Sequence, residues 1–438
     1  MLYSNFYNMM PDGTIKQINP FTKTEVWSVP GRSSKPITNA IPADAQKIEK
    51  RNEDDYCSFC RTRYHETPPE KSRLVYQDGS YRLLSNLFPS SYRDTVPIFR
   101  RVPNLFEIVT IDYWRKNYDF KLSESKRRWK EAFLNDPSGL EHVINVLNYK
   151  LRVSGKSDEE IDKISMEEKF LLGDAFFGGG HELIIADKHY QDGAEWDSQL
   201  YSSGMMSPDE HFQYFKFTIE AMKDIIANNR YVRYISIFQN WLQQAGASFD
   251  HLHKQLVALD EWGSRIEMQI KELKDNPNAF NDFGANFASM KNLLIAENEY
   301  AIAYVGIGHR YPTIEIYSKS THSRPNEHTD EELKGMSDLV HSCHVAMGNQ
   351  ISCNEEWYYT PMDAVNKMPW HIFIRWRINT PAGFEGGTGI YINPLRPVEL
   401  RDKMVPRLYK ARDEKLIFNL RIAEECRVSP NPLKYYYS

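Results

Sequence analysis

The chain has 438 residues, more than one ordinary hydrophobic core accommodates, so we expect two domains or two fused copies of one domain. Hydrophobic residues make up 41% and aromatic residues 13%, a composition that excludes global disorder. The formal net charge of -5 is mild and there is no basic tract, so a nucleic-acid partner is not expected.

Targeting and redox signals are sparse. The N-terminal residues contain no apolar core long enough for a signal peptide. No stretch approaches the roughly 20 apolar residues that a membrane span needs. The five cysteines are few for a chain of this length and odd in number, which argues against a disulfide framework. These features predict a cytoplasmic protein without a membrane partner.

The first part of the chain combines an arm, short strands and a helical insertion. Residues 1–50 are rich in Pro, Ser, Thr and Asn and predict an extended N-terminal arm. Strand-like runs begin at Tyr81, and another spans residues 106–111. A charged stretch at about 115–175 has helical periodicity and no strand signal, so we interpret it as a helical insertion.

The remaining elements predict an internal duplication. A helix from about Pro208 to Asn229, capped by Ser207, separates two strands from two further strands. The same order recurs downstream around a helix capped by Thr329. The repeat pairs the loop histidines His189 and His322 and the strand histidines His251 and His371. We therefore divide the chain into an arm (1–50), a first half with the insertion (51–275), and a second half (276–438) that ends in a helix from about 399 to 426.

The clearest chemical motif is the alternation of His251, His253 and Gln255. In a strand, alternate residues point to one face, so two imidazoles and one amide would converge there. A neutral imidazole attacks phosphorus when its second nitrogen is held by an acceptor. The small residues 246–248 would let backbone amides approach a phosphate. The alternative is a strand edge with solvated histidines.

Two further motifs leave alternatives open. Cys57 and Cys60 form a C-x-x-C pair that needs two more ligands for tetrahedral zinc, and His189 and His251 are available. The pair could instead be unligated buried thiols, whereas a redox dithiol is less favoured because no thioredoxin-like helix start follows. Glycines surround Glu385, which suits either a loop that closes over a polar ligand or a hairpin turn.

Together these segments resemble galactose-1-phosphate uridylyltransferase, a branch of the histidine-triad superfamily. The resemblance rests on five segments in family order: residues 19–22 with 30–36, 57–60, 85–89, 181–189 and 240–255. The last of these keeps the family's internal spacing and is the most specific. Residues 383–385 also resemble the family's sugar-contacting segment.

The resemblance implies an α+β fold of two fused histidine-triad-like halves, with an antiparallel sheet and flanking helices, in a homodimer. It also implies zinc bound by Cys57, Cys60, His189 and His251. His253 would be the nucleophile, Gln255 would hold phosphoryl oxygens, and Ser248 would bond the phosphate. The substrate-binding residues implied are Asn86 and Asn240 near nucleoside and phosphate, Arg32 and Lys35 at the substrate phosphate, and Glu385 at the hexose.

The implied activity is exchange of a nucleoside monophosphate, with UMP expected, between a nucleotide sugar and a sugar 1-phosphate in galactose metabolism. Gln255 cannot shuttle a proton as histidine can, which favours transfer over hydrolysis. Leu252 and Lys254 depart from the family's usual proline and glycine, and Phe373 stands where the second half would need another histidine. The second half is therefore expected to be non-catalytic. The alternatives are a nucleotide-sugar or dinucleotide phosphorylase and a non-catalytic, zinc-stabilised nucleotide-binding protein.

Overall fold

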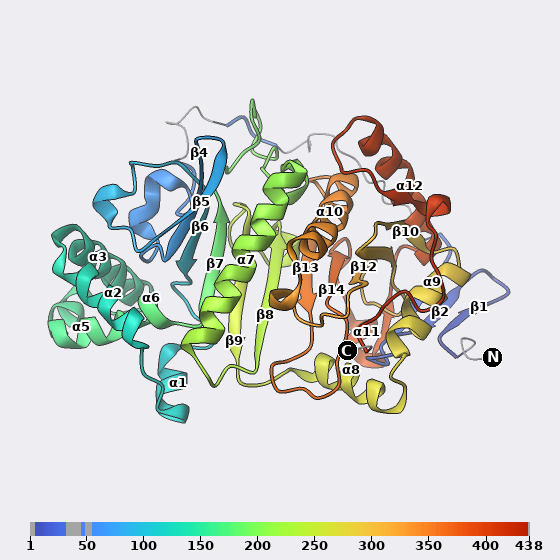
Figure 1. Cartoon of the computed structure of the whole chain (residues 1–438), viewed down its shortest axis with the longest axis horizontal. Helices are drawn as coiled ribbons and strands as arrows, with labels where there is room; N and C mark the ends of the chain where they lie inside the picture. The colour runs from blue at the N-terminus through green and yellow to red at the C-terminus, as the bar shows by residue number, and fades with distance from the viewer. Residues whose placement is uncertain (1–4, 32–44, 49–54, 437–438) are drawn as a thin grey trace.

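The computed structural model describes residues 5–31, 45–48 and 55–436. Arg32 and Lys35 lie outside these ranges. In the described part, twelve strands form one sheet in the order β16-β10-β11-β12-β14-β13-β8-β9-β7-β6-β4-β5 (Figure 1). All neighbouring strands in it are antiparallel. The structure confirms an α+β fold with an antiparallel sheet.

The strands of the large sheet divide between the two halves of the chain. The first half contributes β4 (Ser72–Gln77), β5 (Ser80–Ser85), β6 (Pro97–Pro103), β7 (His181–Ala186), β8 (Tyr234–Trp241) and β9 (His253–Leu259). The second contributes β10 (Leu294–Glu297), β11 (Ala301–Val305), β12 (Thr313–Ser318), β13 (Cys353–Tyr358), β14 (His371–Trp376) and β16 (Arg421–Ile422).

The strand order shows the duplication. Reading outward from the pairing of β13 with β8, each half presents two strands that follow its long helix and then two that precede it. The halves join through the register from Cys353↔Trp241 to Trp357↔Ile237. Because the sheet runs unbroken across this join, both halves share one core. The domain boundary at residues 275 and 276 falls at the end of a helix and stays a prediction.

Two long helices, α7 (Pro208–Asn228) and α10 (Asp330–Met347), lie side by side on one face of the sheet (Figure 1). Ser207 caps α7 and accepts a hydrogen bond from the Glu210 amide at 3.1 Å. Thr329 caps α10 in the same way. Both helices therefore begin where the capping residues predict. The opposite face of the central strands holds the candidate site.

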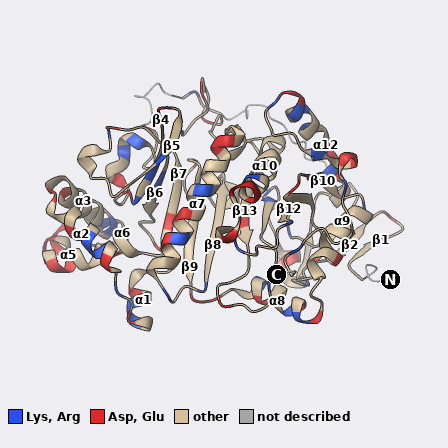
Figure 2. Ribbon diagram, viewed as in Figure 1, with Lys and Arg blue, Asp and Glu red and all other residues tan. Residues whose placement is uncertain are grey.

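The predicted insertion is helical. It contains α1 (Ile111–Tyr118), α2 (Glu124–Asn135), α3 (Pro137–Val153), α4 (Asp158–Asp162), α5 (Met166–Leu172) and α6 (Asp174–Gly178). These helices gather beside β4–β6 at one end of the molecule, and acidic and basic residues are interspersed along them (Figure 2). In the described part of the chain, no helix has the length and apolarity needed to cross a bilayer.

The structure corrects the predicted extended arm. Within residues 1–50, β1 (Tyr7–Met9), β2 (Ile15–Ile18) and β3 (Glu25–Ser28) form a small sheet. Its fourth strand, β15 (Ile390–Ile392), comes from the end of the second half and runs parallel to β3. Pairing with a strand so far along the chain could not be read from local composition.

The strand predicted at residues 106–111 is also wrong. The segment is a loop, because side chains replace strand partners: Asn104 accepts from the Phe106 amide at 2.9 Å, and His181 accepts from the Ile108 amide at 3.1 Å. Thr110 then caps α1. Asn104 and Thr110 are local partners, and His181 is 73 residues away in sequence. Hydrogen bonds from backbone amides to these side chains replace the strand pairing that the β propensity of the segment favours.

The C-terminal helix is shorter than predicted. The remaining α-helices of the described part are α8 (Ser264–Asp275), α9 (Asn286–Met290), α11 (Gly383–Thr388) and α12 (Pro397–Asp413). Lys415 has a φ of 58°, a left-handed conformation that ends a helix, and the chain then enters β16. The glycine-rich segment around Glu385 is neither an open loop nor a hairpin turn but the short helix α11.

Candidate active site and metal centre

The structure brings together the four predicted zinc ligands, which are distant in sequence. The Cys57 Sγ lies 4.0 Å from the Cys60 Sγ and 3.5 Å from the Nδ1 atoms of both His189 and His251. The Cys60 Sγ lies 3.7 Å from His189 Nδ1 and 3.9 Å from His251 Nδ1. All four ligand atoms lie within 4.8 Å of one another.

These distances fit a tetrahedral metal. Zinc–sulfur bonds of about 2.3 Å and zinc–nitrogen bonds of about 2.0 Å set sulfur and nitrogen ligands roughly 3.5 Å apart. The outer nitrogen of His251 is held as well, because its Nε2 donates to the Ala186 carbonyl at 2.7 Å. Two thiols and two imidazoles leave no open position for a substrate, so an ion here would have a structural role.

His253 is the first residue of β9 and is 96% buried, since 4% of its surface is exposed. His251 precedes the strand rather than lying within it, which corrects the expectation that both histidines belong to one strand. The Nδ1–H of His253 donates to the His251 carbonyl at 2.7 Å. The lone pair of the imidazole is therefore on Nε2.

Burial keeps this imidazole neutral. Desolvation lowers the pKa of His253 to about 4, against the smaller opposing effect of the hydrogen bond to the His251 carbonyl. A neutral ring with a fixed tautomer is the form that acts as a nucleophile. The His253 ring also meets the Phe59 ring edge to face at 5.1 Å, which restricts its rotation.

A cavity of about 260 Å³ opens beside His253, and Gln255 and Ser248 line it with that residue. Leu252, Lys254 and Leu256 are buried. The Lys254 ammonium lies over the rings of Tyr214 and Phe215 from α7, on the other face of the sheet. The predicted alternation therefore holds for His253 and Gln255, which face the cavity, whereas His251 belongs to the Cys57–Cys60–His189 cluster and does not line the cavity.

Sequence reasoning missed His181, which orients Gln255. The Nδ1 of His181 accepts from the Ile108 amide, so its proton is on Nε2. That Nε2 lies 3.1 Å from the Gln255 Oε1 and donates to it. With its oxygen so engaged, Gln255 has an NH2 group that meets no partner among the described residues and can serve as a donor at the cavity.

Asn104 was also missed, and Asn86 does not line this cavity. Asn86 is exposed, follows β5 and has a φ of 58°. Asn104 and Phe106 do line the cavity with His253. They belong to a second N-x-F sequence, so the pattern at residues 86–88 also occurs at residues 104–106. Spacing alone could not choose between them.

The other predicted binding residues lie elsewhere. Asn240 is on β8 and lines a different cavity on the same face of the sheet. Glu385 is on α11, among the second-half elements and away from β9 (Figure 1). Its carboxylate accepts from the Ala382 amide at 2.8 Å. One chain therefore does not bring Glu385 to the His253 cavity.

Known proteins resemble this chain in sequence and in fold. The chain is 26% identical over 187 residues to ADP-glucose phosphorylase of Arabidopsis thaliana, a match to 41% of this chain and about half (53%) of that relative. The crystal structure of an ADP-glucose phosphorylase from the same plant, with bound ADP-glucose, has a TM-score of 0.56 at 18% identity and covers 89% of this chain and 97% of that one. A GALT-like protein from Arabidopsis thaliana has a TM-score of 0.53 at 18% identity, with 80% and 92% covered.

These likenesses confirm, for the fold, the predicted resemblance to the galactose-1-phosphate uridylyltransferase group. At the level of sequence families, residues 10–435 match the family described as "Domain of unknown function (DUF4921)". Because this match spans nearly the whole chain, the protein belongs to the DUF4921 family.

Proposed function

We propose that the protein transfers a nucleoside monophosphate from a nucleoside-diphosphate sugar to a phosphate-bearing acceptor through a covalent bond to His253. The observation that carries this proposal is the His253 imidazole, buried at a cavity with its Nδ1 held by a carbonyl and its Nε2 unprotonated. Zinc bound by Cys57, Cys60, His189 and His251 would stabilise the segment that aims it.

The first half-reaction forms one bond and breaks one. The lone pair of His253 Nε2 attacks the α-phosphorus, and the bond from that phosphorus to the bridging oxygen breaks. The sugar phosphate leaves with the electron pair of that bond. In the second half-reaction, an acceptor phosphate oxygen attacks the same phosphorus and the phosphorus–nitrogen bond breaks. The Gln255 NH2 and the Ser248 hydroxyl are placed to bond the phosphoryl oxygens.

The rim of the cavity suits a nucleobase. Three of its aromatic residues retain large exposed fractions: 49% for Phe106, 50% for Tyr149 and 37% for Phe249. Aromatic rings left open around a cavity can stack on a flat ligand. Tyr149 belongs to α3, so the helical insertion contributes to the mouth of the cavity.

Two acceptors are candidates. The family resemblance favours a sugar 1-phosphate with UMP as the transferred group. The sequence match to an ADP-glucose phosphorylase favours inorganic phosphate with AMP. The cavity contains the same nucleophile for both, so the first half-reaction is shared and the acceptor distinguishes them.

Labelling of the protein tests the proposal. The chain is incubated with UDP-glucose or ADP-glucose labelled in the α-phosphate, quenched and examined for acid-labile, base-stable label. We expect label with one of the two donors, released by galactose 1-phosphate or by inorganic phosphate. Absence of label with both donors, in zinc-loaded protein, would reject covalent transfer and favour a nucleotide-binding protein.

We also propose a homodimer, because the Glu385 segment lies far from His253 within one chain. If Glu385 contacts the hexose, a second copy must supply it. Light scattering measures the mass in solution. If each site is built from both subunits, mixing equal amounts of His253→Ala and Glu385→Ala chains should restore about a quarter of wild-type activity, because half of the dimers are mixed and each has one intact site. A monomer, or no complementation, would contradict this arrangement.

A further inference from the structure

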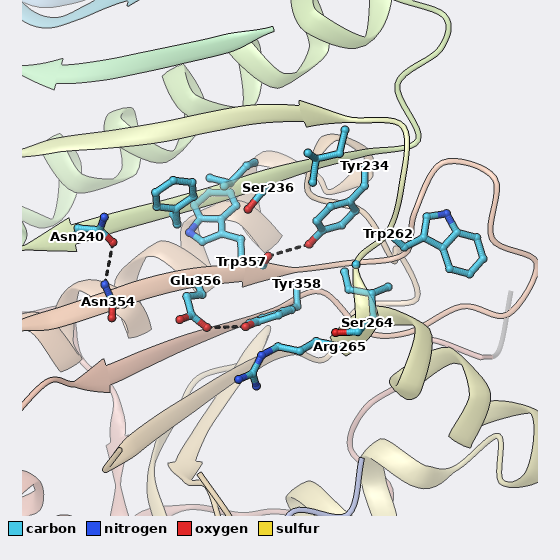
Figure 3. A pocket seen from close by; sticks show the side chains of 15 residues that line it. Tyr234, Ser236, Asn240, Trp262, Ser264, Arg265, Asn354, Glu356, Trp357 and Tyr358 are labelled. Atoms are coloured by element: carbon cyan, nitrogen blue, oxygen red, sulfur yellow. Dashed lines mark hydrogen bonds between the residues drawn. The ribbon is translucent and has the colours of Figure 1, made fainter. Parts of the chain in front are cut away.

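A second cavity, of about 450 Å³, lies outside the site described above. Its walls come from β8, β13 and the turn between β9 and α8 (Figure 3). It is larger than the cavity at His253, and of the residues predicted from the sequence it includes Asn240. Its remaining polar residues, among them Arg265 and Glu356, have no role in the transfer mechanism.

The strand register places this cavity beside the nucleophile. Gln255 of β9 pairs with Phe238 of β8, and Phe238 pairs with Glu356 of β13. Directly paired residues in an antiparallel sheet point to the same face. Strands are about 4.8 Å apart, so Glu356 lies roughly 10 Å across the sheet from Gln255. A molecule with one end at His253 could extend over Asn240 into this cavity.

Arg265 supplies a positive charge to this cavity. It is half-buried at the start of α8, and its side chain extends across the cavity towards Glu356 (Figure 3). Among the described residues, its guanidinium has no hydrogen-bond or ion-pair partner. A guanidinium offers five N–H donors in a planar fork that matches a phosphate group. An unpaired arginine lining a cavity is therefore a candidate anion contact.

Glu356 supplies the acceptor. Its Oε2 receives hydrogen bonds from the Arg375 Nε at 2.8 Å and the Tyr358 hydroxyl at 2.5 Å. Burial raises the pKa of this carboxyl, but Arg375, the Tyr358 hydrogen bond and Arg265 outweigh that effect, so the pKa is lowered and the group is charged. Both of these hydrogen bonds go to Oε2. Oε1 has no hydrogen-bond donor among the described residues and can accept a hydrogen bond from a ligand hydroxyl.

The remaining walls suit a sugar ring. Trp262 and Tyr358 line the cavity, and Asn240 adds an amide at the end opposite Trp262 (Figure 3). The Glu356 carboxylate is paired with Arg375, so a paired carboxylate and a guanidinium without a hydrogen-bond partner in the described part of the chain line the same cavity. The guanidinium favours a phosphate group, whereas a carboxylate oxygen and an amide favour hydroxyls.

We propose that this second cavity binds the sugar phosphate portion of the substrate, with Arg265 bonding its phosphate and Glu356 its hydroxyls. This inference rests on the proposed function, and it places hexose contacts on the same chain as His253 in addition to the Glu385 contact proposed across subunits. The alternative ligand of the same chemistry is inorganic phosphate, which would use Arg265 and not Glu356.

Isothermal titration of the full, zinc-loaded chain tests the assignment. The titrants are glucose 1-phosphate, galactose 1-phosphate, inorganic phosphate and the nucleoside monophosphate of the labelling donor. We expect one hexose 1-phosphate to bind more tightly than inorganic phosphate. Arg265→Ala should weaken that binding roughly tenfold to a hundredfold, the range of one charge-assisted hydrogen bond. Arg265→Lys should recover part of it, and nucleoside monophosphate binding should not change.

A matched control is Arg128→Ala, which removes an exposed arginine from α2 and should leave all affinities unchanged. Glu356→Gln should weaken hexose 1-phosphate binding and not phosphate binding, with thermal melting used to confirm that the variant folds. Equal affinity of wild type and Arg265→Ala for every hexose 1-phosphate would overturn the assignment, as would equal affinity of wild type for phosphate and hexose 1-phosphate.

The labelling experiment separates this inference from the proposed function. Label on the wild-type chain together with hexose 1-phosphate binding that does not depend on Arg265 would reject only the second cavity. Hexose 1-phosphate binding that depends on Arg265 in a chain that no donor labels would support the cavity as a sugar phosphate site and reject covalent transfer.

Discussion

His253 and His371 each begin a strand, β9 in the first half and β14 in the second. The Nδ1 of each donates to the carbonyl two residues earlier, at 2.7 Å to His251 and 2.8 Å to Pro369. Burial is the main cause that lowers the pKa of each to about 4. By these features His371 corresponds to His253. The order of elements in the sequence instead pairs His371 with His251.

The two histidines differ in what surrounds Nε2. His253 lines an open cavity. His371 is fully buried, with its ring stacked on Tyr317 at 4.6 Å and on Tyr358 at 5.2 Å. Its Nε2 lies 3.4 Å from the Gln269 amide nitrogen, which donates to it. The same imidazole geometry can therefore serve chemistry in one half and packing in the other, because access to Nε2 decides its role.

The largest expected effect comes from removing the two histidines in turn. His253→Ala should abolish labelling and lower turnover by roughly 10⁴-fold or more, the scale on which loss of a nucleophile acts. His371→Ala should retain the label, because its ring touches no reacting atom, although the lost stacking will lower the melting temperature. Quantified label per folded chain measures both. Label on His253→Ala would show that another residue is the nucleophile.

The second test concerns the predicted zinc site, whose four ligands all belong to the first half. Purified protein should contain about one zinc per chain, and Cys57→Ser should lose most of it because a tetrahedral site with three ligands binds weakly. His371→Ala should retain the zinc. Mass spectrometry of metals, with Cys343→Ser as a control at a buried cysteine outside the cluster, checks this. Absence of zinc in protein prepared without chelator would contradict the site.

A smaller effect is expected at Gln255, the residue that follows His253 on the same face. Gln255→Ala should slow turnover about 10²-fold, the usual cost of one phosphoryl or oxyanion donor, and should still allow labelling. His181→Ala should produce part of this loss, and adding it to Gln255→Ala should cost little more, because His181 acts by orienting the amide. Additive losses in the double variant would show that His181 has a separate role.

The smallest effect is expected at Tyr149, the contact from the insertion. Tyr149→Ala should raise the Michaelis constant for the nucleotide sugar about two- to tenfold, the equivalent of one aromatic contact, and leave the rate of labelling at saturation unchanged. Tyr149→Phe should behave as wild type. If Tyr149→Ala leaves the Michaelis constant unaltered, the insertion does not shape the substrate mouth.

The sequence alone determined the features that depend on local rules. Ser207 and Thr329 start the two long helices because a side-chain oxygen caps the free amides of the first turn. The alternation of His253, Lys254 and Gln255 separates cavity from core because strand side chains alternate. The order of elements was enough to predict two similar halves.

Tertiary structure decided what depends on residues distant in the chain. Asn104, and not Asn86, lines the cavity at His253. Asn104 follows β6, which pairs with β7 next to β9, whereas Asn86 follows β5, which is the edge strand of the sheet. His181 orients Gln255 only because β7 pairs with β9, and Arg265 lines the same cavity as Glu356 only because the fold brings the start of α8 to the cavity bordered by β13. A one-dimensional pattern contains the residue types, but such contacts exist only after the sheet has brought its strands together.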